Sequence, residues 1–181
     1  DEIKGDIVVR MATSGEKFTD LFGNEHELTD QDMVIADDNG ILALAGVIGG
    51  ARGSTTENTK NIILESAYFD PVSVRKSAKR LGISTDASYR YERGIDPTMT
   101  GRAAMRAAQI IMDACGGKIV GACATGSDDA PDIKIAYTPK YFAQKIGFDM
   151  DADTQKSILE RLGYALKISG DKWTVTPRPA R

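Results

Sequence analysis

The chain has 181 residues, of which 41% are hydrophobic and 27% are charged, so it is long enough for one or two soluble domains with a real core. Its formal net charge of −3 argues against a general affinity for nucleic acids. No apolar run approaches the roughly 20 residues that span a bilayer, and we expect no signal peptide from the first residues.

The cysteines and the histidine suggest no catalytic or metal centre. Cys115 and Cys123 match no common zinc-ligand spacing, so we expect reduced thiols in or near the core of a cytosolic protein. The single histidine, His26, lies in a polar hairpin pattern, where we expect it to be exposed. The sequence holds no Ser/His/Asp, Cys/His or metal-ligand set, so we expect no independent hydrolase centre and no metal site.

The first sixty residues have the pattern of β-strands. A short apolar run covers residues 7–11, and the stretch 18–28 is broken by Gly23-Asn24, a turn signal between two strands. Residues 33–36 and 41–45 flank Asn-Gly, which predicts a hairpin. Neither of these two runs alternates strictly, so we expect this hairpin to be covered on both faces.

Helices follow, with clear start and stop signals. Asp70-Pro71 and Asp96-Pro97 each place a capping carboxylate before a proline, which predicts helices over 71–81 and 97–115. Gly82 would stop the first helix, and residues 118–124 are typical of a returning strand. The pattern predicts an α+β fold, with mixed β-sheets and helices packed on one side in β/β/α layers.

A second, smaller domain is predicted after a polar, structure-breaking stretch at 126–131, which divides the chain into domains 1–129 and 130–181. Thr138-Pro139 opens a helix that Gly147 stops, and Asp153 would cap another helix. Residues 164–168 and 173–175 then form a hairpin across Gly170-Asp171. Two helices and a hairpin give a winged-helix-like outline.

Three strings within about fifty residues indicate a recognition pocket. Glycines let a ligand approach the backbone, and the carboxylate in the apolar strand that we expect over residues 62–67 needs a hydroxyl or a cation to satisfy it. The third string is a polar loop with arginines. The strings are Gly46-Val47-Ile48-Gly49-Gly50, Ile62-Ile63-Leu64-Glu65-Ser66-Ala67 and Thr85-Asp86-Ala87-Ser88-Tyr89-Arg90-Tyr91-Glu92-Arg93-Gly94-Ile95-Asp96-Pro97.

These strings, in this order and spacing, closely resemble the editing domain of the bacterial phenylalanyl-tRNA synthetase beta subunit. Residues 1–125 resemble the C-terminal part of that domain, and residues from 132 onward resemble the small helical domain that follows it. The chain would then be a fragment of a much larger protein. The resemblance implies hydrolysis of the ester bond that joins tyrosine, attached in error, to the phenylalanine tRNA.

The resemblance also implies the site residues. Glu65 matches the glutamate that accepts a hydrogen bond from the tyrosine hydroxyl, a contact that a phenylalanyl ring cannot make. Gly46 and Gly49 match the glycines of one pocket wall, where the missing Cβ leaves room for an aromatic ring. Thr85 and Ala87 match the opposite wall and the contacts to the aminoacyl group. From the residues alone, Glu65 could instead form an ion pair with a nearby arginine.

Basic residues around the third string leave two roles open. Arg90, Glu92 and Arg93 could form a network that shapes the loop, or they could contact the 3′ end of the tRNA. The stretch 71–106 holds eight basic residues against three acidic ones, a local charge of +5 that could meet RNA phosphates. The same charges could equally form solvated helix faces with some ion pairs.

The family pocket also uses a histidine and an arginine that lie upstream of residue 1. The resemblance therefore implies that this chain carries one wall of the pocket. Whether the chain hydrolyses tyrosyl-tRNA by itself, or only together with the upstream residues, stays open. ATP and magnesium are implied for the whole enzyme, outside this chain. The implied partners are the phenylalanine tRNA and the alpha subunit, in a cytoplasmic alpha2-beta2 heterotetramer.

Two other functions compete with editing. A non-catalytic RNA-binding or scaffold module of the same subunit would be favoured if Glu65 were locked in a salt bridge with no cavity beside it. Editing would be favoured if Glu65 faced a cavity lined by Gly46, Gly49 and Ala87. A nucleotide-binding domain is disfavoured, because no glycine turn in the sequence opens a capped helix over a phosphate.

Overall fold

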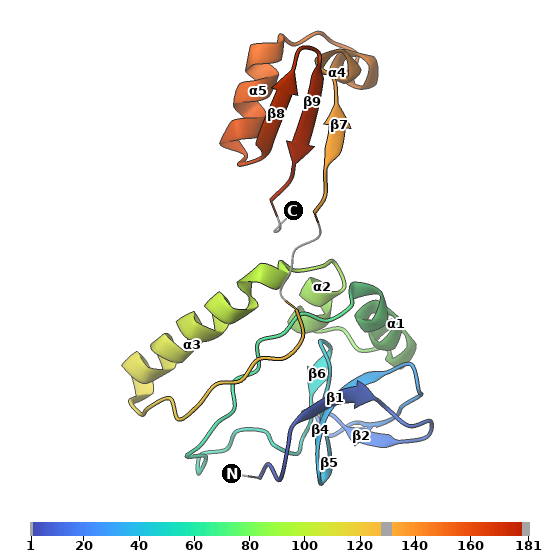
Figure 1. The fold of residues 1–181 in the computed structure, drawn as a ribbon. Helices are drawn as coiled ribbons and strands as arrows, with labels where there is room; N and C mark the ends of the chain where they lie inside the picture. The colour runs from blue at the N-terminus through green and yellow to red at the C-terminus, as the bar shows by residue number, and fades with distance from the viewer. Residues whose placement is uncertain (1, 128–131, 179–181) are drawn as a thin grey trace. The chain divides into compact units, whose positions relative to one another are not determined.

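The computed structural model describes residues 2–127 and 132–178, and the chain divides into two compact units (Figure 1). One unit comprises Asp1–Ile95 and Thr100–Ala122, and the other comprises Asp96–Met99 and Cys123–Arg181. The predicted boundary between residues 129 and 130 lies outside the described residues. Helices and antiparallel sheets occur in both units, which confirms the α+β class.

Antiparallel hairpins build the first unit, as the turn signals predict. Asn39-Gly40 turns β4 into β5, with Gly40 at a φ of 120°, and Gly23 at 83° lies in the turn between β2 and β3. The four-stranded sheet has the order β1 (Val8–Met11), β4 (Met33–Asp37), β5 (Gly40–Leu44) and β6 (Ile48–Gly49), and the two-stranded sheet pairs β2 (Lys17–Thr19) with β3 (Glu25–Glu27).

The core of the first unit lies between these strands and one helix, α1 (Pro71–Leu81). Residues 34–37 of β4 are all buried, so both faces of this strand are covered, as predicted. Phe69, Val74 and Ala78 pack into the same cluster as the strand residues. A layer of strands covered by a helix follows, because the apolar stripe of α1 needs the sheet to bury it.

Both ends of α1 follow the predicted signals. The Asp70 side chain accepts a hydrogen bond from the Ser73 backbone N–H at 2.7 Å, and Gly82 ends the helix in the left-handed conformation at a φ of 68°. The helix is tied to the strands by polar contacts as well: the buried Asp32 accepts hydrogen bonds from Ser77 and from Arg80. These contacts fix the position of α1 against the sheet.

The prediction of a polar loop over residues 85–97 is wrong in its first half, because residues 86–91 form a short helix, α2 (Asp86–Tyr91). Thr85 starts it through a capping box: its side chain accepts from the Ser88 N–H at 3.0 Å, and the Ser88 hydroxyl accepts from the Thr85 N–H at 2.9 Å. Figure 1 shows α1 and α2 side by side.

The helix predicted over 97–115 begins later. Pro97–Met99 form a single 3-10 turn, and α3 spans Thr100–Cys115. The strand predicted over 118–124 is wrong, because this segment pairs with none of the described strands. The expectation that both cysteines lie in or near the core is also wrong: Cys115 and Cys123 are exposed, since α3 has no fully buried residue and the segment after it is exposed.

The strand predicted over 62–67 is likewise absent. Ile62, Ile63 and Leu64 are exposed by 52%, 63% and 43% of their surfaces. An apolar run gains little from a strand conformation unless a neighbouring strand pairs with it, and none does so among the described residues. The run nevertheless leads into Phe69, which is buried in the core.

The second unit is a three-stranded antiparallel sheet with two helices, and the two predicted helices and the hairpin are found there. Gly147 ends the first helix at a φ of 87°. The predicted cap of the second helix is wrong by two residues: Asp151, not Asp153, accepts the Thr154 N–H at 2.8 Å. The elements are β7 (Ile135–Tyr137), α4 (Pro139–Ile146), α5 (Ala152–Arg161), β8 (Ala165–Ser169) and β9 (Lys172–Thr176), with the sheet order β7-β9-β8.

Strand β7 was not predicted, and it is joined to the helices by a buried glutamine. Gln155 accepts a hydrogen bond from the Tyr137 hydroxyl and donates to the Pro139 and Met150 carbonyls at 3.3 and 2.7 Å. A strand of three residues, with only Ile135 and Tyr137 as large apolar side chains, is too short to give a recognisable sequence pattern. The winged-helix outline stays a prediction.

Buried aspartates, Asp20 and Asp37 among them, give the first unit an acid-sensitive stability. Burial acts to raise the pKa of Asp20, but hydrogen bonds from His26 and Asn24 outweigh it and lower the pKa to about 2. Hydrogen bonds from Arg52 hold the pKa of Asp37 well below its usual range. Both carboxyl groups bind their protons more weakly in the folded than in the unfolded protein. The stability that they contribute is therefore complete above their pKa in the unfolded chain, near 4, and is lost as the pH falls through their pKa in the folded protein.

We therefore expect the midpoint of thermal unfolding to fall steeply between about pH 4 and pH 2. Circular dichroism at a series of pH values measures it. An Asp20→Asn variant should show a shallower fall, because it lacks one of the linked protons. A midpoint that is constant over this range, or equal slopes in both proteins, would contradict the assignment.

Candidate functional site

Gly46 lies in the tight turn between β5 and β6, at a φ of +68° that other residues rarely adopt. A Cβ atom there would stand 2.9 Å from Val74 Cγ2, 3.0 Å from Phe69 Cδ2 and 3.4 Å from Tyr91 Cγ. The space beside Gly46 is thus filled by core side chains. The need for glycine at this position comes from packing and backbone conformation in this structure.

Thr85 fastens α2 to the same turn. Its hydroxyl donates to the Val47 carbonyl at 2.6 Å, while its oxygen also accepts the Ser88 N–H at the helix start. Ala87 lies in the first turn of α2 and is half-buried. The structure therefore brings together the Gly46 turn and the helix that carries Thr85 and Ala87, which are 39 and 41 positions further along the chain.

Tyr91, at the other end of α2, connects the helix to the segment that carries Glu65. Its hydroxyl donates to the Ala67 carbonyl at 3.2 Å, and its ring packs on Phe69 with centroids 5.3 Å apart. Burial raises the pKa of Tyr91, and the nearby negative charge of Glu65 raises it further. A phenol therefore already lies within electrostatic reach of the Glu65 carboxylate.

Glu65 itself makes no ion pair or hydrogen bond with any other residue that the structure describes. The residue as a whole is exposed, yet the protein around its carboxyl group desolvates it enough to raise its pKa. The alternative of an ion pair with a nearby arginine is not observed. The carboxylate is left available for a hydroxyl or a cation.

Gly49 lies three residues after Gly46, on β6, and has a different neighbour. Its carbonyl accepts a hydrogen bond from the Leu21 N–H at 3.0 Å, and a Cβ on Gly49 would stand 3.1 Å from Leu21 Cδ1. The turn between β2 and β3 therefore lies against this glycine. The sequence predicts that turn at Gly23-Asn24, but nothing local in it indicates a contact 28 positions away.

The turn that carries Leu21 is organised by the buried carboxylate of Asp20. It accepts from the backbone N–H groups of Phe22 and Asn24 at 2.8 and 3.0 Å, and lies 2.8 Å from His26 Nε2. The expectation that His26 is exposed is therefore wrong: only 13% of its side chain is accessible. Its position on β3, opposite Phe18, turns the ring toward Asp20 and places it 6.2 Å from the Phe18 ring.

Glu92 and Arg93 contact each other just after α2, with Arg93 Nη1 2.5 Å from Glu92 Oε1. Arg93 also donates to the Tyr89 carbonyl at 2.7 Å and lies over the Tyr89 ring at 3.6 Å. Arg90 is exposed and forms no ion pair among the described residues. Glu92 and Arg93 shape the end of the helix in this structure, and contact of any of the three with tRNA stays a prediction.

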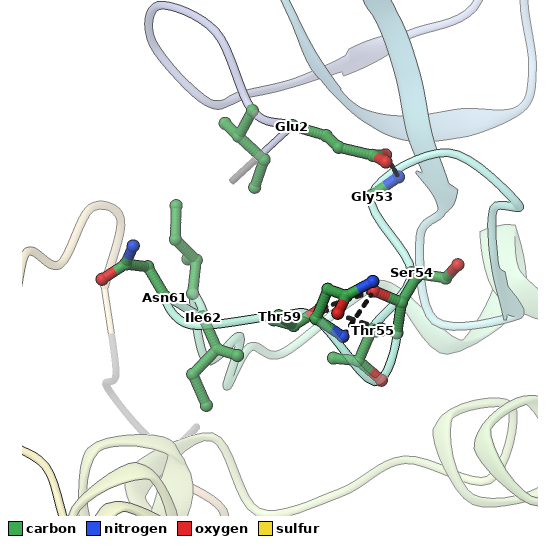
Figure 2. A pocket seen from close by; sticks show the side chains of 11 residues that line it. Glu2, Gly53, Ser54, Thr55, Thr59, Asn61 and Ile62 are labelled. Carbon is green, nitrogen blue, oxygen red and sulfur yellow. Dashed lines mark hydrogen bonds between the residues drawn. The ribbon is translucent and has the colours of Figure 1, made fainter.

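The first unit also has a cavity of about 280 Å³ that the sequence did not indicate (Figure 2). Figure 2 shows the Glu2 carboxylate accepting the Gly53 N–H, at 3.0 Å, across from Ser54 and Thr55. None of the predicted pocket residues lines this cavity, although Ile62 borders it three positions before Glu65. Its hydroxyl and amide groups can donate and accept hydrogen bonds, and Glu2 is the only titratable group among its lining residues that the structure describes.

A second cavity, of about 370 Å³, lies within the second unit and is mostly apolar. Its polar lining residues are Tyr137, Gln155 and Tyr164, and the Tyr137 hydroxyl already donates a hydrogen bond to Gln155. Residues 2–127 and 132–178 contain no group of three or more His, Cys, Asp or Glu side chains that could hold a metal ion. No described helix is long and apolar enough to cross a membrane.

Comparison with known proteins identifies the class. Residues 1–116 match the B3/4 domain family, so the chain belongs to that family. Its relatives include the phenylalanine–tRNA ligase beta subunits of Yersinia pestis, 38% identical, and of Wolbachia sp. subsp. Brugia malayi, 40% identical, each over 96% of this chain. The chain spans about a fifth of the length of these relatives, 22% of each.

A solved N-terminal fragment of the phenylalanyl-tRNA synthetase beta subunit from Pyrococcus horikoshii is similar over 99% of this chain and 52% of its own length, with 16% identity and a TM-score of 0.43. The family match and the two bacterial relatives confirm the resemblance inferred from the three sequence strings.

Gly46 and Gly49 should respond differently to a methyl group. Gly46→Ala should lower the free energy of unfolding by about 2–4 kcal/mol, because the left-handed backbone and the contacts with Val74 and Phe69 both oppose a Cβ. Gly49→Ala should cost less than about 1 kcal/mol, since its backbone is unstrained and the exposed Leu21 side chain can move. Urea unfolding of both variants measures this, and equal losses would contradict it.

Proposed function

We propose that this chain contributes one wall of a tRNA-editing site in a phenylalanine–tRNA ligase beta subunit. The site hydrolyses the ester of tyrosine attached in error to the phenylalanine tRNA. Such a second site is needed because a synthetic pocket that rejects tyrosine only by its extra hydroxyl allows some leakage.

The observation that carries this proposal is the carboxylate of Glu65. It has no ion-pair partner among the described residues, it is partly desolvated, and it lies within electrostatic reach of a phenol, that of Tyr91. A carboxylate in this setting gains a hydrogen bond from a tyrosyl hydroxyl, whereas a phenylalanyl ring would desolvate it without compensation. This is the chemistry by which an editing site selects tyrosine.

The other predicted residues support the same site in different ways. Thr85 and Gly46 belong to elements joined by the hydrogen bond from Thr85 to Val47, and Ala87 follows on the same helix. Gly49 keeps a small surface beside Leu21. The arrangement positions a substrate, and it supplies no general base, so hydrolysis would depend on a positioned water and on groups of the tRNA itself.

Within the whole enzyme, the partners would be the phenylalanine tRNA and an alpha subunit, in an alpha2-beta2 heterotetramer in the cytoplasm. ATP and magnesium would serve the ligase reaction at other domains. The name shared by the relatives, a beta subunit, supports an alpha partner.

A scaffold role for the same residues is the second candidate, and one observation favours it. Ile62, Ile63 and Leu64 expose apolar surface just before Glu65, as segments that pack against another part of a larger assembly do. In that case Glu65 would contribute to packing or assembly and would have no effect on the hydrolysis of tyrosyl-tRNA.

Deacylation of tyrosyl-tRNA made with the phenylalanine tRNA distinguishes the two candidates. This chain should be compared with a longer form that includes the upstream histidine and arginine. We expect hydrolysis by the longer form and less or none by this chain, because one pocket wall is missing. No hydrolysis by either protein, together with normal folding, would contradict editing and favour the scaffold role.

A further inference from the structure

We propose that Leu21 is a specificity-determining residue that forms the outer wall of the site beside Gly49 and contacts the aromatic ring of the aminoacyl ester. The proposal rests on the proposed editing function. It adds to the site a residue from the β2–β3 turn, a part of the chain that the three sequence strings do not include.

The first support is contact geometry. The three nearest atoms to a Cβ built on Gly49 all belong to Leu21, at 3.1, 3.4 and 3.9 Å. Leu21 is nevertheless 51% exposed, so the rest of its side chain is not buried in the core. The residue therefore presents a branched apolar surface next to the glycine. Such a surface is suited to the face or edge of an aromatic ring.

The second support is that the backbone holds Leu21 firmly in this place. Leu21 N–H bonds to the Gly49 carbonyl at 3.0 Å, and the Ala51 N–H bonds to the Thr19 carbonyl at 3.0 Å, on the other side of the pair formed by Asp20 and Gly50. Backbone hydrogen bonds on both sides of Asp20 thus join the turn to β6 and to the residue pair that follows it. An exposed leucine on an unanchored loop could not define the width of a pocket.

The third support is the interior of the turn. The Asp20 carboxylate is 2% exposed and satisfies the backbone N–H groups of Phe22 and Asn24, and His26 and the Asn24 amide complete its shell. A fully satisfied buried carboxylate makes the turn one rigid unit. The backbone position of Leu21 is therefore set by the fold before any substrate arrives, as pre-organised recognition requires.

These contacts predict the effect of substitution at Leu21 in the complete subunit. Leu21→Ala removes the wall, so kcat/KM for tyrosyl-tRNA should fall about tenfold through lost apolar contact. Phe22→Ala is the matched control: Phe22 is 79% exposed on the same turn, and none of the three atoms nearest to the Gly49 position belongs to it. We expect this control to keep normal activity.

A double-mutant cycle with Gly49 provides the sharper test, with deacylation of tyrosyl-tRNA as the measurement. Gly49→Ala alone should cost about threefold, because its methyl group pushes Leu21 outward by a few tenths of an ångström. In the Leu21→Ala background the same change should have almost no effect, since there is no longer a side chain to displace. If the loss of activity in the double variant equals the product of the losses in the two single variants, the proposal is overturned.

The outcomes separate this proposal from the function on which it rests. If the wild-type subunit does not hydrolyse tyrosyl-tRNA, the editing function and the role of Leu21 fail together. If the wild type is active but Leu21→Ala is as active, or if Phe22→Ala loses as much activity, the editing function stands and the wall at Leu21 is contradicted. Far-ultraviolet circular dichroism of each variant verifies that the turn substitutions leave the protein folded.

Discussion

Replacing Gly49 by Trp should reduce hydrolysis of tyrosyl-tRNA by the complete subunit at least about hundredfold, because the indole would occupy the place next to Leu21 that we propose for the substrate ring. Backbone strain does not explain the expected loss, since Gly49 is not among the glycines with positive φ. Aminoacylation of the tRNA should continue at its normal rate, because our proposal assigns the ligase reaction to other domains.

Two further variants test whether this effect is steric. Ala87→Trp, on the helix that forms the proposed opposite wall, should abolish editing in the same way. Gly49→Ala should be much milder than Gly49→Trp. Equal loss from the alanine and tryptophan variants would indicate that the backbone at residue 49 needs glycine, and normal editing by both tryptophan variants would show that these walls are not the site. Gly46 is unsuitable for this test, because substitution there should destabilise the core.

Glu65→Ala should reduce the preference for tyrosyl- over phenylalanyl-tRNA by about ten- to hundredfold, from one lost hydrogen bond worth about 1.5–3 kcal/mol. The loss should fall on tyrosyl-tRNA alone, since the phenylalanyl ring has no hydroxyl to bind. Deacylation rates of the two charged tRNAs, measured side by side, give the ratio.

Glu92→Ala is the matched control for Glu65. Glu92 is a second glutamate near α2, but its carboxylate is engaged with Arg93. We expect its removal to leave the tyrosyl preference within about twofold of the wild type. If Glu65→Ala keeps the wild-type preference, Glu65 does not bind the phenol. The scaffold interpretation would then be favoured.

The sequence predicts those elements whose signals are local. Asp70 and Gly82 bound α1 because a cap and a left-handed glycine act within one turn of the helix. The hairpin at Asn39-Gly40 follows from the φ that its turn requires. Each of these predictions depends on the chemistry of a few neighbouring residues, and each is confirmed.

The errors arise where the conformation depends on distant partners. The apolar run that contains Ile62 has the composition of a strand, but a strand needs a neighbour, and no described segment pairs with it. His26 looks like a surface residue because its sequence neighbours are polar, whereas its burial is decided by Asp20 and by Phe18 on the facing strand. The start of α2 was missed for a local reason, because the capping box here uses Ser88 instead of the more common Glu or Gln.

The candidate site divides in the same way. Glu65, Gly46, Gly49, Thr85 and Ala87 could be proposed from the sequence only through the family resemblance, since each alone is a common residue in a common setting. Leu21 could not be proposed at all, because its contact with Gly49 exists only once the β2–β3 turn is folded against β6.

The most direct test of the central claim is the ratio of deacylation rates for tyrosyl- and phenylalanyl-tRNA, both made with the phenylalanine tRNA, in the complete subunit that carries this chain. The editing account predicts rapid release of tyrosine and slow release of phenylalanine, with the difference lost in Glu65→Ala. Equal release of the two amino acids by the wild-type protein, or none of either, would contradict it.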